Sequence, residues 1–263
     1  MGQDQRIRSG QAAFAKGFVV PVVLLAGAQA WFVAAHVRSD TLASPAAVAV
    51  AFVAALRDGS LLQATGQTLL AAFGGLAIGG GIGLLVGFLL GLFKILDRLL
   101  EVTVESLRPI PAVALIPLAI LLFGFGYRLE MTCVAFSCAW TMLILTRGAV
   151  AGVEIRLLEV SDALRFNLFD KIVKFVLPAA LPRVFVAFRL ATSLSLIVAV
   201  TTEIAANPIG LGYGMIIAEQ TLHPEVMLAF LVWIGLLGWV LNQALLFMQR
   251  TCFGRAALGE GSC

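Results

Sequence analysis

Residues 66–93 of this 263-residue chain read GQTLLAAFGGLAIGGGIGLLVGFLLGLF, a stretch without a charged side chain. A helix needs about 20 apolar residues to cross a hydrocarbon core about 30 Å thick, at about 1.5 Å per residue. The stretch is therefore predicted to be a transmembrane helix. The bilayer, rather than a core closed off from water, is the solvent that this sequence fits.

The composition of the whole chain agrees with that prediction. Hydrophobic residues make up 60% and charged residues 13%, whereas soluble domains carry about 25% charged residues. Apolar runs recur along the chain and predict a single all-α, polytopic membrane domain over residues 1–263, with about six transmembrane helices. The runs fall at about 18–37, 66–93, 109–126, 129–147, 184–206 and 226–248.

The basic residues predict the orientation of these helices. If the N-terminus is cytoplasmic, only Arg38, Arg57 and Arg128 of the 18 Lys and Arg residues fall in outer segments. Cytoplasmic loops carry the excess of Lys and Arg, so both termini are expected in the cytoplasm. The run 18–37 is longer than the roughly 7 to 15 residues of a signal-peptide core and is interpreted as a retained first helix.

Within the stretch 66–93, glycines recur at every fourth residue and so share one helix face. Another helix backbone can approach such a face closely, which is how small residues promote helix association in lipid. The partner is either a helix of the same bundle or a second subunit. The glycines predicted to pack in this way are Gly75, Gly79, Gly83, Gly87 and Gly91.

Several enzyme classes lack their motifs here. No Gly-Lys-Ser/Thr phosphate loop, Gly-x-Ser elbow or His-Glu-x-x-His pair occurs, and the only histidines are His36 and His223. The four cysteines lack metal-site spacing, and the net charge of +3 does not suggest nucleic-acid binding. We therefore expect a protein that is not an enzyme and has no cofactor, metal site or nucleic-acid partner.

Prolines, glycines and one acidic residue mark a candidate pathway. Internal prolines kink a helix, and an ionisable residue inside an apolar run is expensive and often functional. Glu203, near the outer end of its run, either faces a pathway or only reaches the membrane interface. The candidate pathway or gating residues are Pro109, Pro111, Pro117, Glu203, Gly210 and Gly212.

Two connections are too long to be plain turns. The outer one, 38–65, contains the apolar stretch 46–56, which predicts a short helix at the membrane surface. The cytoplasmic one, about 148–183, mixes charges with exposed apolar residues, a composition that favours a protein partner.

Residues 157–164, LLEVSDAL, and 176–182, VLPAALP, resemble the EAA loop of binding-protein-dependent ABC importer permeases. The resemblance implies a coupling helix that docks on a separate ATPase subunit. In a helix that begins near Glu159, residues 161, 164, 165 and 168 would share one face. Arg165 and Phe166 stand where the family has glycine and alanine. The implied coupling residues are Glu159, Ser161, Ala163, Leu164, Arg165, Phe166, Leu177, Pro178 and Pro182.

The resemblance extends from about residue 44 to residue 250 and is closest to the nitrate, sulfonate and taurine branch of that family, through SLRPIP at 106–111 and Glu203 with the glycines after it. It implies a type I permease fold in a bacterial inner membrane, two permease copies surrounded by lipid, two ATPase subunits and an extracytoplasmic binding protein. A small anion such as nitrate, sulfonate or taurine is the implied solute. The alternatives are a secondary carrier or channel without an ATPase, and a scaffold subunit without a pathway.

Overall fold

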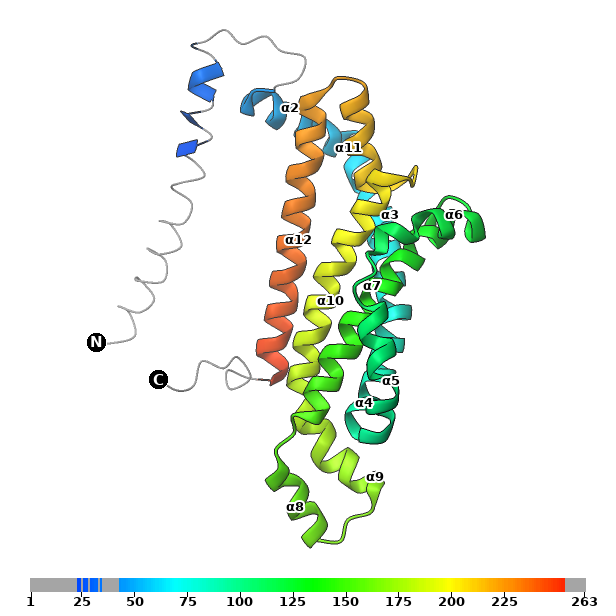
Figure 1. The fold of residues 1–263 in the computed structure, drawn as a ribbon. Helices are drawn as coiled ribbons and strands as arrows, with labels where there is room; N and C mark the ends of the chain where they lie inside the picture. Colours follow the sequence, from blue (N-terminus) through cyan, green and yellow to red (C-terminus); the bar gives the residue numbers. More distant parts are fainter. Residues whose placement is uncertain (1–22, 25, 28, 33, 35–42, 254–263) are drawn as a thin grey trace, which may run out of the picture. The chain divides into compact units, whose positions relative to one another are not determined.

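A computed structural model describes residues 23, 24, 26, 27, 29–32, 34 and 43–253. Within that part every regular element is a helix (Figure 1), which confirms the all-α prediction. The predicted first helix, 18–37, lies largely outside the described residues. The chain divides into two compact units, Met1–Ser60 with Met215–Val232 and Leu61–Gly214 with Trp233–Cys263.

The helices from residue 43 onward follow one another with short breaks. In chain order they are α2 (Pro45–Arg57), α3 (Ser60–Gly75), the π-helix η1 (Leu76–Gly80), α4 (Gly81–Leu92), α5 (Lys94–Leu107), the 3₁₀ turn η2 (Ala112–Leu115), α6 (Ile116–Phe123), α7 (Tyr127–Ala151), α8 (Ile155–Ala163), α9 (Leu168–Lys171), the π-helix η3 (Ile172–Val176), α10 (Leu177–Ala205), α11 (Gly210–Gln220) and α12 (Pro224–Phe253).

The described residues contain four helical segments that are long and apolar enough to cross a membrane. They are Ser60–Leu92, Tyr127–Ala151, Leu168–Gln220 and Pro224–Thr251. These correspond to the predicted runs 66–93, 129–147, 184–206 and 226–248. A fifth span results if the bent pair Lys94–Leu107 and Ala112–Phe123 counts as one.

That bent pair corrects the prediction of one kinked helix over 109–126. Residues 94–107, expected in a cytoplasmic connection, form α5, and the chain then turns by 81° before α6. Pro109 and Pro111 have no N–H to give to the carbonyls four residues earlier, so α5 ends just before them. Pro117 lies in the first turn of α6, where a missing N–H has no effect.

The predicted start of the fifth run also needs correction. α10 begins at Leu177 instead of near residue 184, with Pro178 in its first turn. Pro182 lies inside α10, one turn later. The expected connection 148–183 is therefore mostly helical, in the form of α8, α9, η3 and the start of α10.

Helix α7 is the centre of the larger unit and packs on both α4 and α10. A Cβ atom added to Gly79 would lie 1.9 Å from the carbonyl oxygen of Ala135, and one added to Gly83 would lie 2.2 Å from that of Ala139. The glycine face therefore lies against α7 of the same chain, with backbone against backbone. Gly75, Gly87 and Gly91 continue this face, against Val134, Leu143 and Val150.

In the smaller unit, α2 is the short helix predicted over 46–56. Ser44 caps it by accepting a hydrogen bond on Oγ from the N–H of Ala47 at 3.2 Å, and Pro45 follows in the first turn. Both are typical signals of a helix start.

Candidate functional site

Glu203 is enclosed at the end of α10, with 1% of its surface exposed. Its Oε1 accepts a hydrogen bond from the Thr68 hydroxyl on α3, and its Oε2 accepts one from the N–H of Gly212 on α11, each at 2.7 Å. One carboxyl group thus joins three helices. In this structure the side chain lines neither an aqueous interface nor an open pathway.

The glycines that follow Glu203 make room for its carboxyl group. Gly210 has a φ of +88°, and a Cβ atom there would meet Glu203 Oε1. A Cβ atom on Gly212 would lie 2.5 Å from the carbonyl oxygen of Val200. The N–H of Gly210 donates to Oε1 of Gln67 at 3.0 Å. The structure therefore brings the predicted residues Glu203, Gly210 and Gly212 together in one buried site.

A second carboxyl group, which the sequence analysis did not single out, belongs to the same site. Glu130, in the first turn of α7, is fully buried and interacts electrostatically with Glu203. The amide of Asn207 donates to Glu130 Oε2 at 2.9 Å, and its Oδ1 accepts from the N–H of Gly126 at 2.7 Å. We call Thr68, Glu130, Glu203 and Asn207 the carboxyl network. It joins α3, α7, α10 and the segment after α10.

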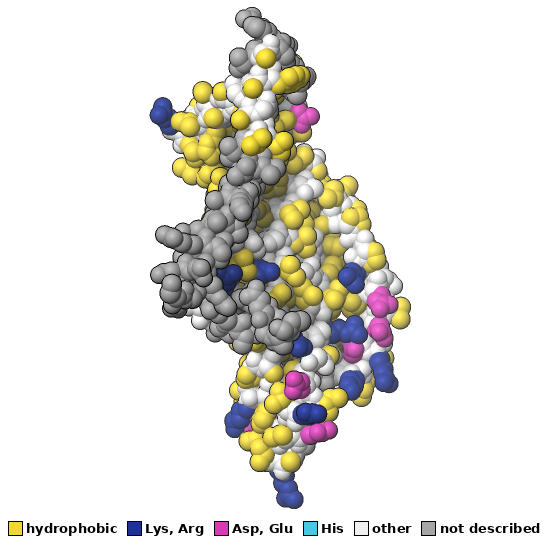
Figure 2. Space-filling model, turned by 90° about the vertical axis from the view of Figure 1, so that its left-hand side faces the viewer, with side chains coloured by type: hydrophobic (Ala, Val, Ile, Leu, Met, Phe, Trp, Pro, Cys, Tyr) yellow, Lys and Arg dark blue, Asp and Glu magenta, His cyan; other side chains and the backbone are white. Residues whose placement is uncertain are grey.

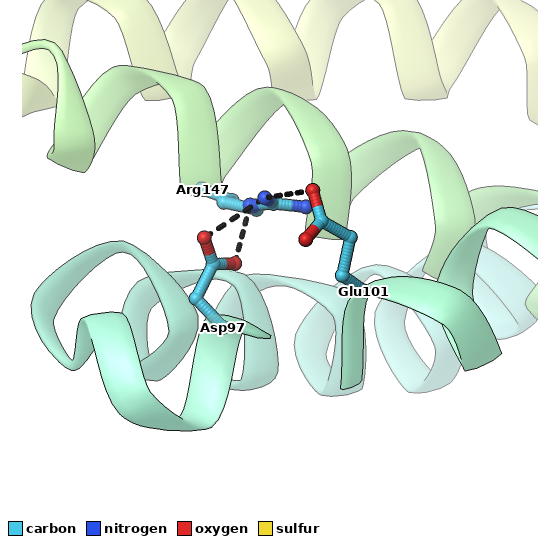
Figure 3. Close-up of polar contacts among 3 residues, drawn as sticks. All are labelled: Asp97, Glu101 and Arg147. Carbon is cyan, nitrogen blue, oxygen red and sulfur yellow. Dashed lines mark hydrogen bonds and ion pairs between the residues drawn. The ribbon is translucent and has the colours of Figure 1, made fainter. Parts of the chain in front are cut away.

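A different ion-pair cluster joins α5 to α7. Arg147 of α7 donates to Asp97 Oδ2 at 2.8 Å and lies 3.8 Å from Glu101 Oε1 (Figure 3). All three side chains are at least partly shielded from solvent. The charges of residues 94–107, which lie between two predicted spans, are thus in part paired with a neighbouring helix.

The predicted coupling segment lies beyond the ends of α7 and α10, where α8 and α9 project (Figure 1). Charged side chains gather toward the same end of the molecule on the face drawn in Figure 2. Leu164, Leu168 and Phe169 expose 61%, 62% and 75% of their surface. These three residues are called the apolar knob.

The predicted single face of this segment is wrong in two respects. α8 ends at Ala163, so Leu168 belongs to α9 and not to the same helix. Ser161 is fully buried, so it faces the protein and not a partner. Phe166 is half-buried, with its ring centroid 5.5 Å from that of Phe175 and the Lys174 ammonium 4.9 Å from its centroid.

The turn after α8 shows how an arginine occupies the family's glycine position. Arg165 has a φ of +53°, in the left-handed region. The N–H of Phe166 donates to the carbonyl of Ser161 at 3.1 Å, the bond that closes a Schellman cap. A left-handed conformation costs a residue with a Cβ atom about 1–2 kcal/mol. The turn is therefore kept, under strain at Arg165.

The remaining predicted coupling residues lie on both sides of this turn. Glu159 and Ala163 are exposed on α8. Leu177, which is 40% exposed, and Pro178 form the first turn of α10, and Pro182 follows inside that helix.

The chain is similar in sequence to known membrane transport proteins. Residues 79–253 match the family described as "Binding-protein-dependent transport system inner membrane component". The putative aliphatic sulfonates transport permease protein SsuC of Bacillus subtilis is 27% identical over 235 residues, covering 89% of this chain and 85% of that protein. The bicarbonate transport system permease protein CmpB of Synechococcus elongatus is 29% identical over 194 residues, covering 73% and 70%.

Solved structures share the fold. A chain of an amino acid ABC transporter crystallised with histidines superposes with a TM-score of 0.64 at 16% identity, covering 76% of this chain and 98% of that one. A chain of the MetNI methionine ABC transporter in an inward-facing conformation gives 0.59 at 21% identity, covering 73% and 93%.

Proposed function

The chain belongs to the family of binding-protein-dependent transport system inner membrane components, and we propose that its apolar knob is the surface on which the importer's ATPase subunit docks. The protein is the membrane-spanning permease subunit of an ABC importer. ATP hydrolysis belongs to a separate subunit of such importers. A carrier that works without an ATPase is thereby set aside.

The exposed apolar residues outside the spans carry this proposal. Leu164 lies in the turn after α8, and Leu168 and Phe169 lie on α9; all three are exposed. Burying one such side chain is worth about 1.5–3 kcal/mol, and a short helix presenting apolar residues suits a groove on a partner. Ser161 and Phe166 support the segment from inside instead of contacting the partner.

The remaining assignments follow from family membership and charge. The permease lies in the inner membrane of a bacterium, in contact with lipid, with both termini in the cytoplasm. It pairs with a second copy of itself, and an extracytoplasmic binding protein delivers the solute. The solute is a small anion such as nitrate, sulfonate or taurine, since the relatives named above handle aliphatic sulfonates and bicarbonate.

The carboxyl network is proposed to act as a gate at the outer end of the pathway. It joins α3, α7, α10 and α11 through one set of buried polar contacts. Such a set favours one arrangement of these helices, and a two-state transporter needs contacts made in only one state. Pro109 and Pro111, in the break after α5, and Pro117, in the first turn of α6, supply a second candidate for movement.

The docking proposal is tested by Leu164→Asp, with Leu222→Asp as the matched control. Leu222 is equally exposed, at 63%, but lies between α11 and α12. Co-purification of the ATPase should fall about tenfold or more in Leu164→Asp and stay unchanged in Leu222→Asp. Normal ATPase recovery and uptake in Leu164→Asp, and also in Phe169→Asp, would show that the ATPase docks elsewhere.

A further inference from the structure

The break between α5 and α6 borders a partly open cavity on the larger unit. Its volume is about 550 Å³, within the roughly 300–1,000 Å³ of small-molecule sites. Residues of the break form one wall, and α7 and α10 form the others. The polar residues in these walls are Arg108, Ser137, Trp140, Thr141 and Thr201.

The cavity lies at the depth of the hydrocarbon core. Its α7 wall runs from Phe136 to Leu145 in a helix that spans Tyr127–Ala151. At about 1.5 Å per residue, the wall begins about 13 Å from one end of α7 and stops about 9 Å from the other. Arg108 therefore lies within the membrane, although the charge count placed it in the cytoplasm.

A cation at this depth requires an explanation. An arginine in the middle of a span costs about 2.5–3.5 kcal/mol on insertion scales, so such residues face a partner or a water-filled space. Arg108 is exposed, and within the described part of the chain no carboxylate lines the cavity or pairs with it. Irregular backbone such as the 108–111 break is tolerated at membrane depth where it lines a cavity.

The other polar side chains of the wall carry no charge. Nε1 of Trp140 is buried and, among the described residues, has no hydrogen-bond partner. The Thr141 and Thr201 hydroxyls already donate to carbonyls of their own helices, those of Ser137 and Ile197. The walls thus offer a cation but no negative charge, which leaves room for a ligand that is itself an anion.

We propose that this cavity binds the oxyanion group of the transported solute on its way through the membrane, with Arg108 as the charge partner. The guanidinium presents two parallel N–H groups that fit the oxygens of a sulfonate, carboxylate or nitrate. The phosphate of a lipid lies at headgroup level, so the depth of the cavity favours the solute. This inference rests on the proposed function and adds to it a site and the chemistry that selects its ligand.

The test measures binding of ethanesulfonate, nitrate and bicarbonate to the purified permease–ATPase complex in nanodiscs, without binding protein or nucleotide. At least one probe should bind the wild type, and Arg108→Gln should weaken that binding about tenfold or more. Arg108→Lys keeps the charge without the fork and should fall between the two.

Arg57→Gln is the control, because Arg57 is an exposed arginine in α2 that is not part of the cavity wall. The Arg57→Gln variant should bind the probe with an affinity within about twofold of that of the wild type. Co-purification of the ATPase with Arg108→Gln shows that the variant is folded. Binding of no probe by the wild type, or equal affinities in Arg108→Gln and Arg57→Gln, would overturn the site.

Failure of this inference is separable from failure of the docking proposal. Probe binding requires neither nucleotide nor movement of α8, so a Leu164→Asp result of either sign leaves the Arg108 comparison intact. Conversely, unchanged binding in Arg108→Gln leaves ATPase docking at the apolar knob untouched.

Discussion

Replacing Gly79 with alanine should force the α3–α4 segment away from α7. The added Cβ atom would lie 1.9 Å from the carbonyl oxygen of Ala135, where ordinary contact begins at 3.4 Å. The obstacle is backbone in a packed helix, so no side-chain rotation relieves it. Gly81, two residues later, has nothing within 4 Å of the equivalent position, which makes Gly81→Ala the matched control.

The comparison isolates the cost of the contact. Both substitutions replace a helical glycine by alanine, which favours the helix by about 0.8–1.0 kcal/mol in each case. Overpacking of a filled interior costs about 1–3 kcal/mol, occasionally more. Gly79→Ala should therefore be about 1–3 kcal/mol less stable than Gly81→Ala, which at about 2–4 °C per kcal/mol is a difference of several degrees in Tm.

Two buried thiols provide the assay. Cys133 and Cys138 lie in α7 with no exposed surface, so a thiol-reactive dye labels them only when the bundle opens. Thermal unfolding is followed in detergent, in a background in which Cys252 and Cys263 are replaced by serine. If Gly79→Ala and Gly81→Ala unfold within a degree of each other, close backbone packing at Gly79 does not stabilise the bundle and the argument fails.

Three further predictions use the same purified protein. Arg165→Gly removes the left-handed strain after α8, worth about 1 kcal/mol, and should increase ATPase co-purification several-fold; weaker co-purification would contradict the strained-turn argument. Glu203→Gln keeps only one of the two acceptor oxygens, so either the Thr68 hydroxyl or the N–H of Gly212 loses its acceptor, and uptake in proteoliposomes should fall about tenfold while membrane insertion persists; normal uptake would exclude a gating role. Arg147→Gln leaves the carboxylate of Asp97 unpaired and should lower stability by about 1 kcal/mol, with recovery in the double variant that adds Asp97→Asn; no recovery would mean that the pair contributes nothing.

The spans were predictable because contact with lipid imposes a one-dimensional rule. A helix in hydrocarbon must satisfy its backbone hydrogen bonds internally and present apolar side chains along its length. The second requirement is visible directly in the uncharged sequence of residues 66–93. The shared face of Gly79 and Gly83 was also predictable, because residues four apart lie on the same side of a helix. The helix that packs against that face could not be predicted, because the spacing of the glycines does not identify their partner.

The sequence analysis missed charged residues whose partners lie far along the chain. Glu130, which the sequence analysis did not single out, is buried against Asn207, 77 residues later. Asp97 and Glu101 lie between two predicted spans, and Arg147 of α7, about 50 residues later, compensates part of their charge. The composition of a short stretch of sequence gives the number of charged residues but not the partners with which they pair.

Helix α10 connects the three regions argued to have separate functions. It begins at Leu177, after the coupling segment, contributes residues 194–201 to the cavity wall, and ends two residues after Glu203 of the carboxyl network. Its 29 residues extend about 43 Å at about 1.5 Å per residue. A displacement of its first turn by a docked ATPase would therefore act on the cavity and on the carboxyl network through one continuous helix. We therefore expect substitutions in α10 to change how ATPase docking affects anion binding, without changing docking itself. Pro182, the one proline inside α10, is the first position to test.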